Sequence, residues 1–203
     1  PFGLLIQQRG ELPLHAGALV PPGGGPALLV AGDSGAGKSN TSASLVQRGW
    51  TLLNDDISRL TFESDHSVVW PGFQSMKLNA SSIQLLGLDP ARLPRTRGFK
   101  EKYYWHLAGG REPCPVGAMV VLVDPDAPPR APQRLTGLDV LETVYQQTFR
   151  PYLVVPLGFQ REHFAQVAKV VQTVPCHRIN AIARRGFDET ADMLRTIVAG
   201  GIQ

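Results

Sequence analysis

Alternation of apolar runs and glycine-rich turns is the main pattern along this chain. Residues 26–31 read Pro-Ala-Leu-Leu-Val-Ala and stop at Gly32, which is typical of a buried strand. Residues 38–48 contain no Gly or Pro and stop at Gly49, which predicts a helix with a glycine after its last turn. This stretch therefore predicts a strand, a glycine-rich loop and a helix, in that order.

Short apolar runs and amphipathic segments alternate over the rest of the chain. Apolar runs predict strands at 51–57, 66–70, 117–123 and 176–179, preceded by short elements at 3–8 and 14–20. Apolar residues at three-to-four spacing predict helices at 80–86, 137–145, 161–172 and 188–198. Residues 88–111 are rich in Arg, Lys, Gly and Pro, with an aromatic cluster at 103–105, and are predicted to be a long, partly mobile loop followed by a strand. Residues 125–134 are predicted to be a Pro-rich surface loop. Strands that alternate with helices around a glycine loop predict an α/β layered domain.

The glycine-rich loop at 32–39 reads Gly-Asp-Ser-Gly-Ala-Gly-Lys-Ser and matches the phosphate-binding pattern G-x-x-x-x-G-K-[ST] throughout. Its glycines allow backbone N–H groups to surround a phosphate, Lys38 can reach the outer phosphates, and the Ser39 hydroxyl can bind Mg²⁺. Because a strand precedes the loop and a helix follows it, we interpret the match as an ATP-binding loop and not as a coincidence among the 21 glycines. The residues expected to bind the nucleotide are Gly32, Asp33, Ser34, Gly35, Ala36, Gly37, Lys38, Ser39 and Asn40.

Composition excludes several other classes of protein. Of the 203 residues 43% are apolar, which favours a globular fold with one core over disorder. The net charge of +3, from 20 basic and 17 acidic side chains, is too small to indicate nucleic-acid binding. No apolar run approaches the length of a membrane span, and no signal peptide is visible. We expect a single cytoplasmic domain over 1–203, with a further N-terminal segment missing because the chain begins at Pro1.

Two adjacent carboxylates follow the predicted helix. Asp55 and Asp56 lie at the end of the apolar run that begins at Thr51. Because neighbouring residues of a strand point to opposite faces, the two acids can perform different tasks only where the strand ends or bends. One could hold Mg²⁺, directly or through water, and the other could accept the proton of an incoming hydroxyl group. An exposed Asn-Asp-Asp turn is the alternative interpretation.

His15 lies in the apolar segment Leu14-His15-Ala16-Gly17-Ala18, ahead of the loop strand. A lone histidine among apolar residues is more often a core residue than a functional one, although imidazole readily serves as a general acid or base. The position of His15 becomes informative in combination with the loop and the two carboxylates.

These three features together resemble the catalytic domain of HPr kinase/phosphorylase, the bacterial serine kinase that acts on the phosphocarrier protein HPr. The matching segments, in the same order and with similar spacing, are His15-Ala16-Gly17, the loop 32–39, Arg48-Gly49 and Asp55-Asp56. The resemblance is specific over residues 14–60. It implies an α/β nucleotide-binding domain akin to phosphoenolpyruvate carboxykinase, with a mixed sheet flanked by helices. It also implies that Asp56 is the general base, assisted by His15 and acting with Lys38, and that Asp55 and Ser39 handle the metal ion.

Downstream, the chain departs from that family. The family signature Leu-Glu-Ile-Arg-Gly-x-Gly after the second strand is absent, so that the downstream metal-binding Glu and the late catalytic Arg of the family have no clear counterpart. The segments 70–78 and 98–103 instead resemble divergent HPr-kinase-related kinases, some of which modify peptide natural products such as lasso peptides on a terminal serine. This resemblance implies a peptide or protein acceptor and points away from HPr itself.

Four basic residues are candidates for contacts with the transferred phosphate or the acceptor: Lys77, Arg97, Lys100 and Lys102. A phosphoryl group in transfer spreads negative charge over its oxygens, which Arg or Lys side chains stabilise. Lys77 and Lys102 are preferred because each neighbours apolar residues that could hold it near a site. A solvated basic loop is the alternative for each of the four.

A later acidic residue offers a different metal ligand. The segment Val120-Val121-Leu122-Val123-Asp124 resembles the magnesium-binding strand of ordinary P-loop ATPases. Under that interpretation Asp124 binds the metal and Asp55-Asp56 is a turn. An Asp before a Pro is, however, also common where a strand ends.

The sequence therefore predicts an ATP- and Mg²⁺-dependent kinase that phosphorylates a serine-type hydroxyl group of a peptide or protein. A small-molecule hydroxyl kinase, an ordinary P-loop ATPase and a nucleotide-responsive regulatory module are the alternatives. We expect no nucleic-acid or membrane partner, and a homo-oligomer is compatible with the sequence.

Overall fold

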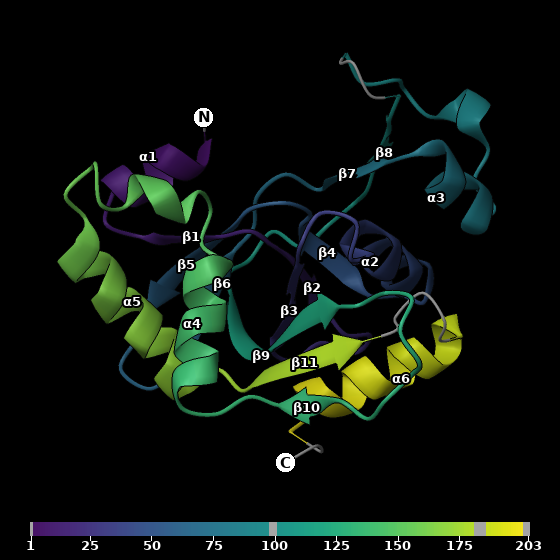
Figure 1. Cartoon of the computed structure of the whole chain (residues 1–203). Helices are drawn as coiled ribbons and strands as arrows, with labels where there is room; N and C mark the ends of the chain where they lie inside the picture. Colours follow the sequence, from purple (N-terminus) through teal and green to yellow (C-terminus); the bar gives the residue numbers. More distant parts are fainter. Residues whose placement is uncertain (1, 98–100, 181–185, 201–203) are drawn as a thin grey trace.

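The computed structural model describes residues 2–97, 101–180 and 186–200, and a mixed sheet forms its centre (Figure 1). The strands are β1 (Leu12–Leu14), β2 (Ala16–Val20), β3 (Ala27–Gly32), β4 (Thr51–Asn54), β5 (Ser58–Phe62), β6 (Ser67–Trp70), β7 (Ser75–Leu78), β8 (Tyr103–His106), β9 (Cys114–Val123), β10 (Gln133–Arg134) and β11 (Cys176–Asn180). Along the main path the order is β1-β5-β6-β9-β3-β2-β4, and β11 extends the sheet from β9. The strands β3, β9 and β11 are parallel, whereas β2 is antiparallel to both of its neighbours, β3 and β4.

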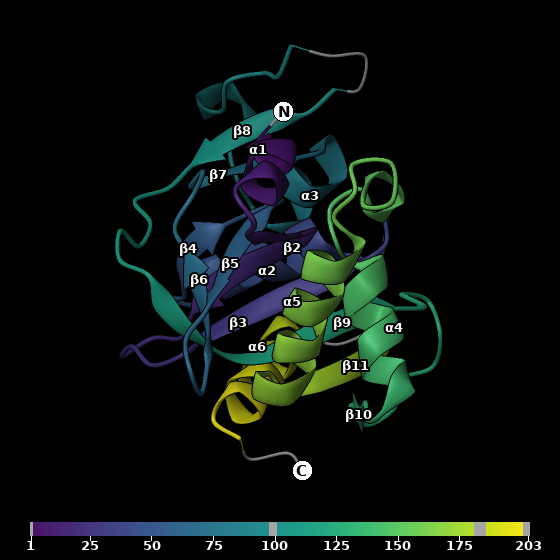
Figure 2. The same cartoon turned by 90° about the vertical axis from the view of Figure 1, so that its left-hand side faces the viewer.

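Helices cover both faces of this sheet. They are α1 (Phe2–Gln8), α2 (Lys38–Gln47), α3 (Ala80–Leu85), α4 (Leu138–Gln146), α5 (Gln160–Thr173) and α6 (Phe187–Val198), with short 3₁₀ turns η1 (Pro90–Arg92) and η2 (Pro151–Leu153). Helices α2 and α6 lie on one face, and α4 and α5 lie on the other (Figure 1 and Figure 2). The predicted α/β fold, a mixed sheet flanked by helices, is confirmed. Over the described residues, no helix has the length and apolar character needed to cross a membrane.

Strand β3 explains why both faces need a cover. Every residue of β3 is buried, and successive side chains point to opposite faces of the sheet. Leu28 and Val30 pack in the core beneath α2 and α6, whereas Leu29 and Ala31 pack in the core beneath α4 and α5. The glycine loop that follows β3 is therefore attached to a strand that is held from both sides.

Strands β7 and β8 form a separate two-stranded ribbon beside the main sheet. The strand β8 lies within residues 88–111 and coincides with the aromatic cluster 103–105, in agreement with the prediction of a loop followed by a strand. Met76, Leu78 and Tyr103 on the ribbon are buried in the same core as α2, and this packing anchors both strands of the ribbon. The ribbon is the element that brings distant residues to the glycine loop.

Candidate phosphate-binding site

The glycine-rich loop joins the end of β3 to the first turn of α2, as the sequence predicts. Gly32, Gly35 and Gly37 have φ angles of 137°, 92° and 98°, in the region that residues with a Cβ rarely adopt. At Gly32 a Cβ would also lie 2.5 Å from the carbonyl oxygen of Leu122, so that only glycine fits between the loop and β9. The loop leads into a helix N-terminus, where unpaired amides favour an anion.

The Lys38 ammonium group lies within this loop. Its Nζ donates hydrogen bonds to the carbonyl oxygen of Gly32 at 2.6 Å and to that of Asp33 at 3.2 Å. Burial lowers the pKa of Lys38, and the charges of Asp56, Asp33 and Asp55 oppose this effect. The loop thus holds a partly desolvated cation beside three carboxylates.

Gln147 connects the loop to His15, which lies between β1 and β2. The side-chain Oε1 of Gln147 accepts a hydrogen bond from the backbone N–H of Gly32 at 3.0 Å. The backbone carbonyl of Gln147 accepts a second one from the N–H of His15 at 2.7 Å. Gln147 is buried, and no local pattern indicates its role, because both contacts join residues far apart in the chain. One residue after α4 therefore fixes two parts of the site.

The pairing of β2 with β4 brings His15 to Asp56. The two strands are antiparallel with Ala18 opposite Asn54, so His15, just before β2, and Asp56, just after β4, lie at the same end of the strand pair. The Nε2 atom of His15 is 3.2 Å from Oδ1 of Asp56. The hydrogen bond from His15 is the largest cause of the lowered pKa of Asp56, and it outweighs burial, which acts in the opposite direction.

Asp55 has a different environment from Asp56. Strand β4 ends at Asn54, and both acids lie in the bend that follows, so the two side chains are free to serve separate tasks. The Oδ2 atom of Asp55 accepts a hydrogen bond from the backbone N–H of Lys77 at 3.2 Å. Burial raises the pKa of Asp55 to about 6, despite this hydrogen bond and the positive charges of Lys77 and Lys102.

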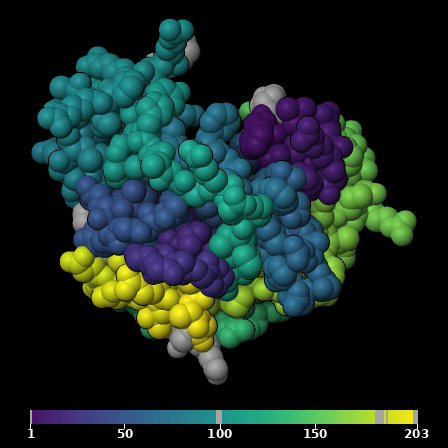
Figure 3. Space-filling model, turned by 180° about the vertical axis from the view of Figure 1, so that it is seen from behind, coloured from purple at the N-terminus to yellow at the C-terminus, as the bar shows by residue number. Residues whose placement is uncertain are grey.

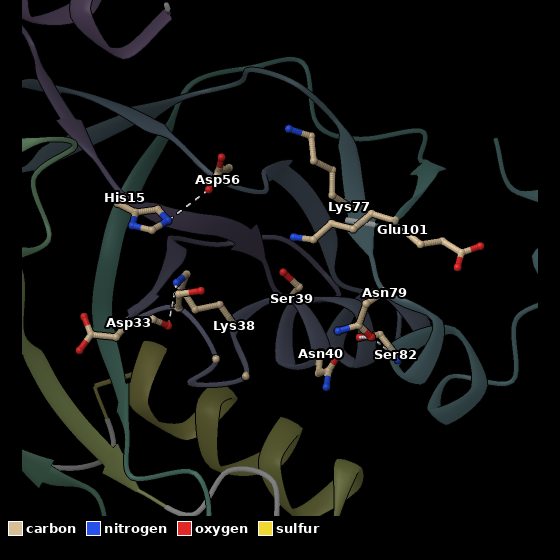
Figure 4. Close-up of a pocket in the computed structure, with 14 residues that line it drawn as sticks. His15, Asp33, Lys38, Ser39, Asn40, Asp56, Lys77, Asn79, Ser82 and Glu101 are labelled. Carbon is tan, nitrogen blue, oxygen red and sulfur yellow. Dashed lines mark hydrogen bonds and ion pairs between the residues drawn. The ribbon is translucent and has the colours of Figure 1, made fainter. Parts of the chain in front are cut away.

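A pocket of about 430 Å³ lies against the loop, and we call it the phosphate pocket. Of the predicted nucleotide-binding residues, those that line it are Asp33, Ser34, Gly35, Gly37, Lys38, Ser39 and Asn40. Gly32 and Ala36 are buried beneath them. In Figure 4, His15 and Asp56 lie on one side of the pocket and Asn40, Asn79 and Ser82 on the opposite side, with Ser39 between them.

The four basic candidates differ in position. Lys77 and Lys102 line the phosphate pocket. Arg97 is exposed and is not among the lining residues. Lys100 lies outside the described residues. Of the three candidates within the described residues, the two preferred lysines are therefore the ones that the fold brings to the loop.

Asn79, Ser82 and Glu101 also line the phosphate pocket, and the sequence analysis did not single them out. Asn79 is the N-cap of α3, where its Oδ1 accepts a hydrogen bond from the N–H of Ser82 at 2.7 Å. An N-cap pattern can be recognised in a sequence, but it says nothing about which pocket the helix start will face. Only the folded ribbon brings this segment to the loop.

A second pocket of about 480 Å³ adjoins the first, because Asp56 and Lys77 line both. We call it the aromatic pocket, and its other lining residues are Phe2, Asn54, Asp55, Ile57, Phe73, Ser75, Tyr104 and His106. Asp55 lines only the aromatic pocket, whereas Ser39 lines only the phosphate pocket. The two residues expected to share a metal ion therefore face different pockets.

The residues in the phosphate pocket are compatible with magnesium. Among the described residues, no group of three or more His, Cys, Asp or Glu is placed to hold a metal ion. A magnesium ion bound by one or two carboxylates together with nucleotide phosphates needs no such cluster. The Ser39 hydroxyl and the Asp56 carboxylate, which line the same pocket, are ligands of this type.

Asp124 does not line either pocket. It follows β9, which is parallel to β3, so the backbone at Asp124 leaves the sheet at the same edge as the glycine loop. The side chain is exposed, its φ is 40°, and its carbonyl oxygen accepts a hydrogen bond from the N–H of Ala127 at 3.1 Å. These features are those of a turn after a strand.

No protein-family model and no curated protein matches the chain. Among solved structures, the chain is similar to the Hpr(Ser) kinase/phosphatase from Coxiella burnetii. The sequences are 17% identical, the match covers 93% of this chain and 94% of that chain, and the TM-score is 0.48. At this identity and TM-score, nothing about activity, substrate or partners follows from the likeness.

Proposed function

We propose that this protein is an ATP- and Mg²⁺-dependent kinase that phosphorylates a serine-type hydroxyl group of a peptide or protein. The observation that carries the proposal is the His15–Asp56 pair, which lines one pocket together with Lys38 and the glycine loop. Binding of a nucleotide alone needs only the loop and its lysine. A carboxylate paired with an imidazole at the same pocket is suited to receive a proton from an acceptor.

Different residues of the pocket would bind the phosphates, accept the proton and stabilise the transferred group. Lys38 and the loop amides would hold the β- and γ-phosphates, with Lys38 exchanging a loop carbonyl for a phosphate oxygen. The acceptor Oγ forms a bond to the γ-phosphorus as the bond to the bridging oxygen breaks and ADP leaves. Asp56 takes the hydroxyl proton, and His15 orients Asp56. Lys77 and Lys102 stabilise the charge on the transferred group.

Magnesium would contribute charge neutralisation at the phosphates and would align the transferred group. Ser39 would provide a direct ligand from the phosphate pocket. Asp55 would contact the ion through water, since it lines the adjoining pocket. This assignment keeps Asp55 with the metal and Asp56 with the acceptor.

The reverse assignment is supported by one observation and must be tested against the first. Burial raises the pKa of Asp55 to about 6, close to the value at which a general base works best near neutral pH. Asp56, which shares a pocket with Ser39, would then bind the metal. Both versions describe the same kinase, and they differ only in which acid accepts the proton and which acid contacts the metal.

The test compares Asp55→Asn, Asp56→Asn and Asp124→Asn. Transfer from labelled ATP to a panel of serine peptides, HPr and small hydroxy compounds is followed by mass spectrometry, and binding of ATP is measured with and without Mg²⁺. We expect Asp56→Asn to lose transfer by about 10² or more and to retain ATP binding, since general acid–base catalysis contributes on this scale.

Other results of these assays would change the assignment of the two acids or contradict the proposal. If Asp56→Asn loses the magnesium dependence of ATP binding and Asp55→Asn loses transfer alone, the roles are reversed. If Asp124→Asn loses transfer while Asp56→Asn retains it, the proposed site is wrong. Tight ATP binding without transfer to any acceptor contradicts the kinase proposal itself, and transfer only to small compounds contradicts the peptide acceptor.

A further inference from the structure

We propose that the aromatic pocket binds the acceptor, and that it selects a peptide with an aromatic or large aliphatic side chain next to the phosphorylated serine. This inference depends on the proposed kinase activity, because it names the acceptor of the same site. It rests on the lining of the pocket, its junction with the phosphate pocket and the exposure of its aromatic side chains.

The ribbon of β7 and β8 forms the floor of the aromatic pocket, because its side chains alternate between the pocket and the core. In the register of the ribbon, Ser75 lies opposite His106 and Lys77 opposite Tyr104. These four side chains share one face and all line the pocket. The residues between them, such as Met76, point to the other face and pack in the core. The core therefore fixes the position of the pocket floor.

The aromatic side chains of this pocket are unusually accessible. Phe73 is 77% exposed and Phe2 is 43% exposed, and their rings meet edge to face with centroids 6.1 Å apart. Tyr104 and His106 stack at 5.8 Å with an interplanar angle of 16°. Figure 3 shows the lobe that carries the ribbon (teal) and helix α1 (purple) on either side of a notch. Apolar rings gathered at one concave site mark a place where another molecule binds.

Continuity with the phosphate pocket identifies the occupant as the acceptor. Asp56 and Lys77 line both pockets, so a hydroxyl group presented from the aromatic pocket meets the proposed base and a cation at the junction. Asn79 and Ser82 lie at the opposite side of the phosphate pocket, which leaves that side for the nucleoside. The volume of about 480 Å³ exceeds one side chain and suits a short peptide segment.

The experiment uses acetylated, fluorescein-labelled heptapeptides of glycine with a central serine. Phenylalanine stands directly before or directly after the serine, and matched peptides carry glycine or aspartate at that position. Transfer from ATP is measured with the serine peptides, and binding is measured by fluorescence anisotropy with versions that carry alanine in place of serine. The protein variants are Phe73→Ala and Tyr104→Ala, with Phe164→Ala on the exposed surface of α5 as the matched control.

We expect a phenylalanine peptide to bind the native protein at least tenfold more tightly than the glycine peptide, as burial of one such side chain allows. Phe73→Ala and Tyr104→Ala should abolish most of this preference, and Phe164→Ala should leave it intact. Neither pocket variant should weaken ATP binding. A loss of ATP affinity in Phe73→Ala would show that the pocket takes the nucleoside, and equal binding of all peptides would likewise overturn the inference.

The two readouts separate this inference from the proposed function. If the phenylalanine peptides bind through Phe73 and Tyr104 but no peptide is phosphorylated, the pocket stands and the kinase proposal fails. If serine peptides are phosphorylated without regard to their neighbours, the kinase proposal stands and the selective pocket fails.

Discussion

Nε2 of His15 lies 3.2 Å from Oδ1 of Asp56, although the glycine loop and helix α2 separate the two residues in the chain. The contact arises from the antiparallel pairing of β2 with β4, so the backbone of the sheet determines it. The backbone N–H of His15 is also fixed by Gln147. The imidazole is thus held at the edge of the phosphate pocket by two independent parts of the fold.

Removal of this imidazole should change the pH dependence of the reaction. The hydrogen bond from His15 lowers the pKa of Asp56, so His15→Ala should raise that pKa and protonate the base at a higher pH. The acidic limb of kcat/KM against pH should therefore move to higher pH, with a loss of about tenfold or more near neutral pH. His15→Gln, which retains a side-chain donor, should restore part of the shift. An unmoved acidic limb in His15→Ala would contradict the role of Asp56 as the base.

Lys38 should be essential for nucleotide affinity. Truncation of one partner of a desolvated charge contact costs about 2 kcal/mol or more, so Lys38→Met should weaken ATP binding by about 30-fold or more. Isothermal titration calorimetry with ATP and Mg²⁺ measures this directly. Lys169→Met on the exposed surface of α5 is the control and should bind ATP as the native protein does. Equal affinities of the two variants would show that the loop does not hold the phosphates.

Two substitutions of Gln147 should separate its effect on stability from its effect on ATP affinity. Gln147→Leu leaves the buried N–H of Gly32 without its acceptor and should cost about 1–3 kcal/mol of the free energy of unfolding. Gln147→Glu retains an acceptor oxygen but adds a negative charge at the base of the loop, so it should unfold more nearly like the native protein and bind ATP more weakly. Urea unfolding and ATP titration of both variants test this. A stable Gln147→Leu variant would mean that the Gly32 hydrogen bond contributes little.

Asp55 should make the protein less stable as the pH rises. Its folded pKa is raised to about 6 from 3.8, so between these values the native state binds more protons than the unfolded chain, and the free energy of unfolding falls as pH rises. At 1.36 kcal/mol per unit, the full effect is up to about 3 kcal/mol above pH 6. Asp55→Asn, whose amide oxygen can still accept from Lys77, should therefore be more stable than the native protein at pH 8 but not at pH 4.

Urea unfolding at the two pH values is the measurement for Asp55. Asp126→Asn, at an exposed position of the loop after β9, is the control and should change neither value. A destabilised Asp55→Asn variant at pH 8 would indicate that the carboxylate is held by favourable contacts and not by a cost of burial.

The part of the site that lies close together in the chain could be predicted from the sequence. The strand, the glycine loop and α2 are adjacent, and each has a local signal in apolar runs, glycines and helix ends. The end of the strand just before Asp55 and Asp56 could also be anticipated, because two adjacent acids can perform different tasks only where a strand ends or bends. These predictions used only neighbours in the chain.

The rest of the site depends on contacts that no local pattern encodes. Gln147 reaches Gly32 from after α4, and the ribbon carries Lys77 and Asn79 to the loop through packing of Tyr103 in the core. The aromatic residues of β8 favour a strand, but no local pattern indicated that this strand would pair with β7. The sequence also could not predict that Ser39 and Asp55 would line two different pockets.

The ribbon of β7 and β8 belongs to both pockets at once. It carries Lys77 at their junction and Tyr104 in the aromatic pocket, and it leads directly into Asn79 at the far side of the phosphate pocket. A ligand that shifts this ribbon in one pocket therefore changes the shape of the other. Such a coupling is reciprocal by thermodynamic necessity, so each substrate should alter the affinity of the other by the same factor. The affinities for the two substrates are then linked through one two-stranded ribbon.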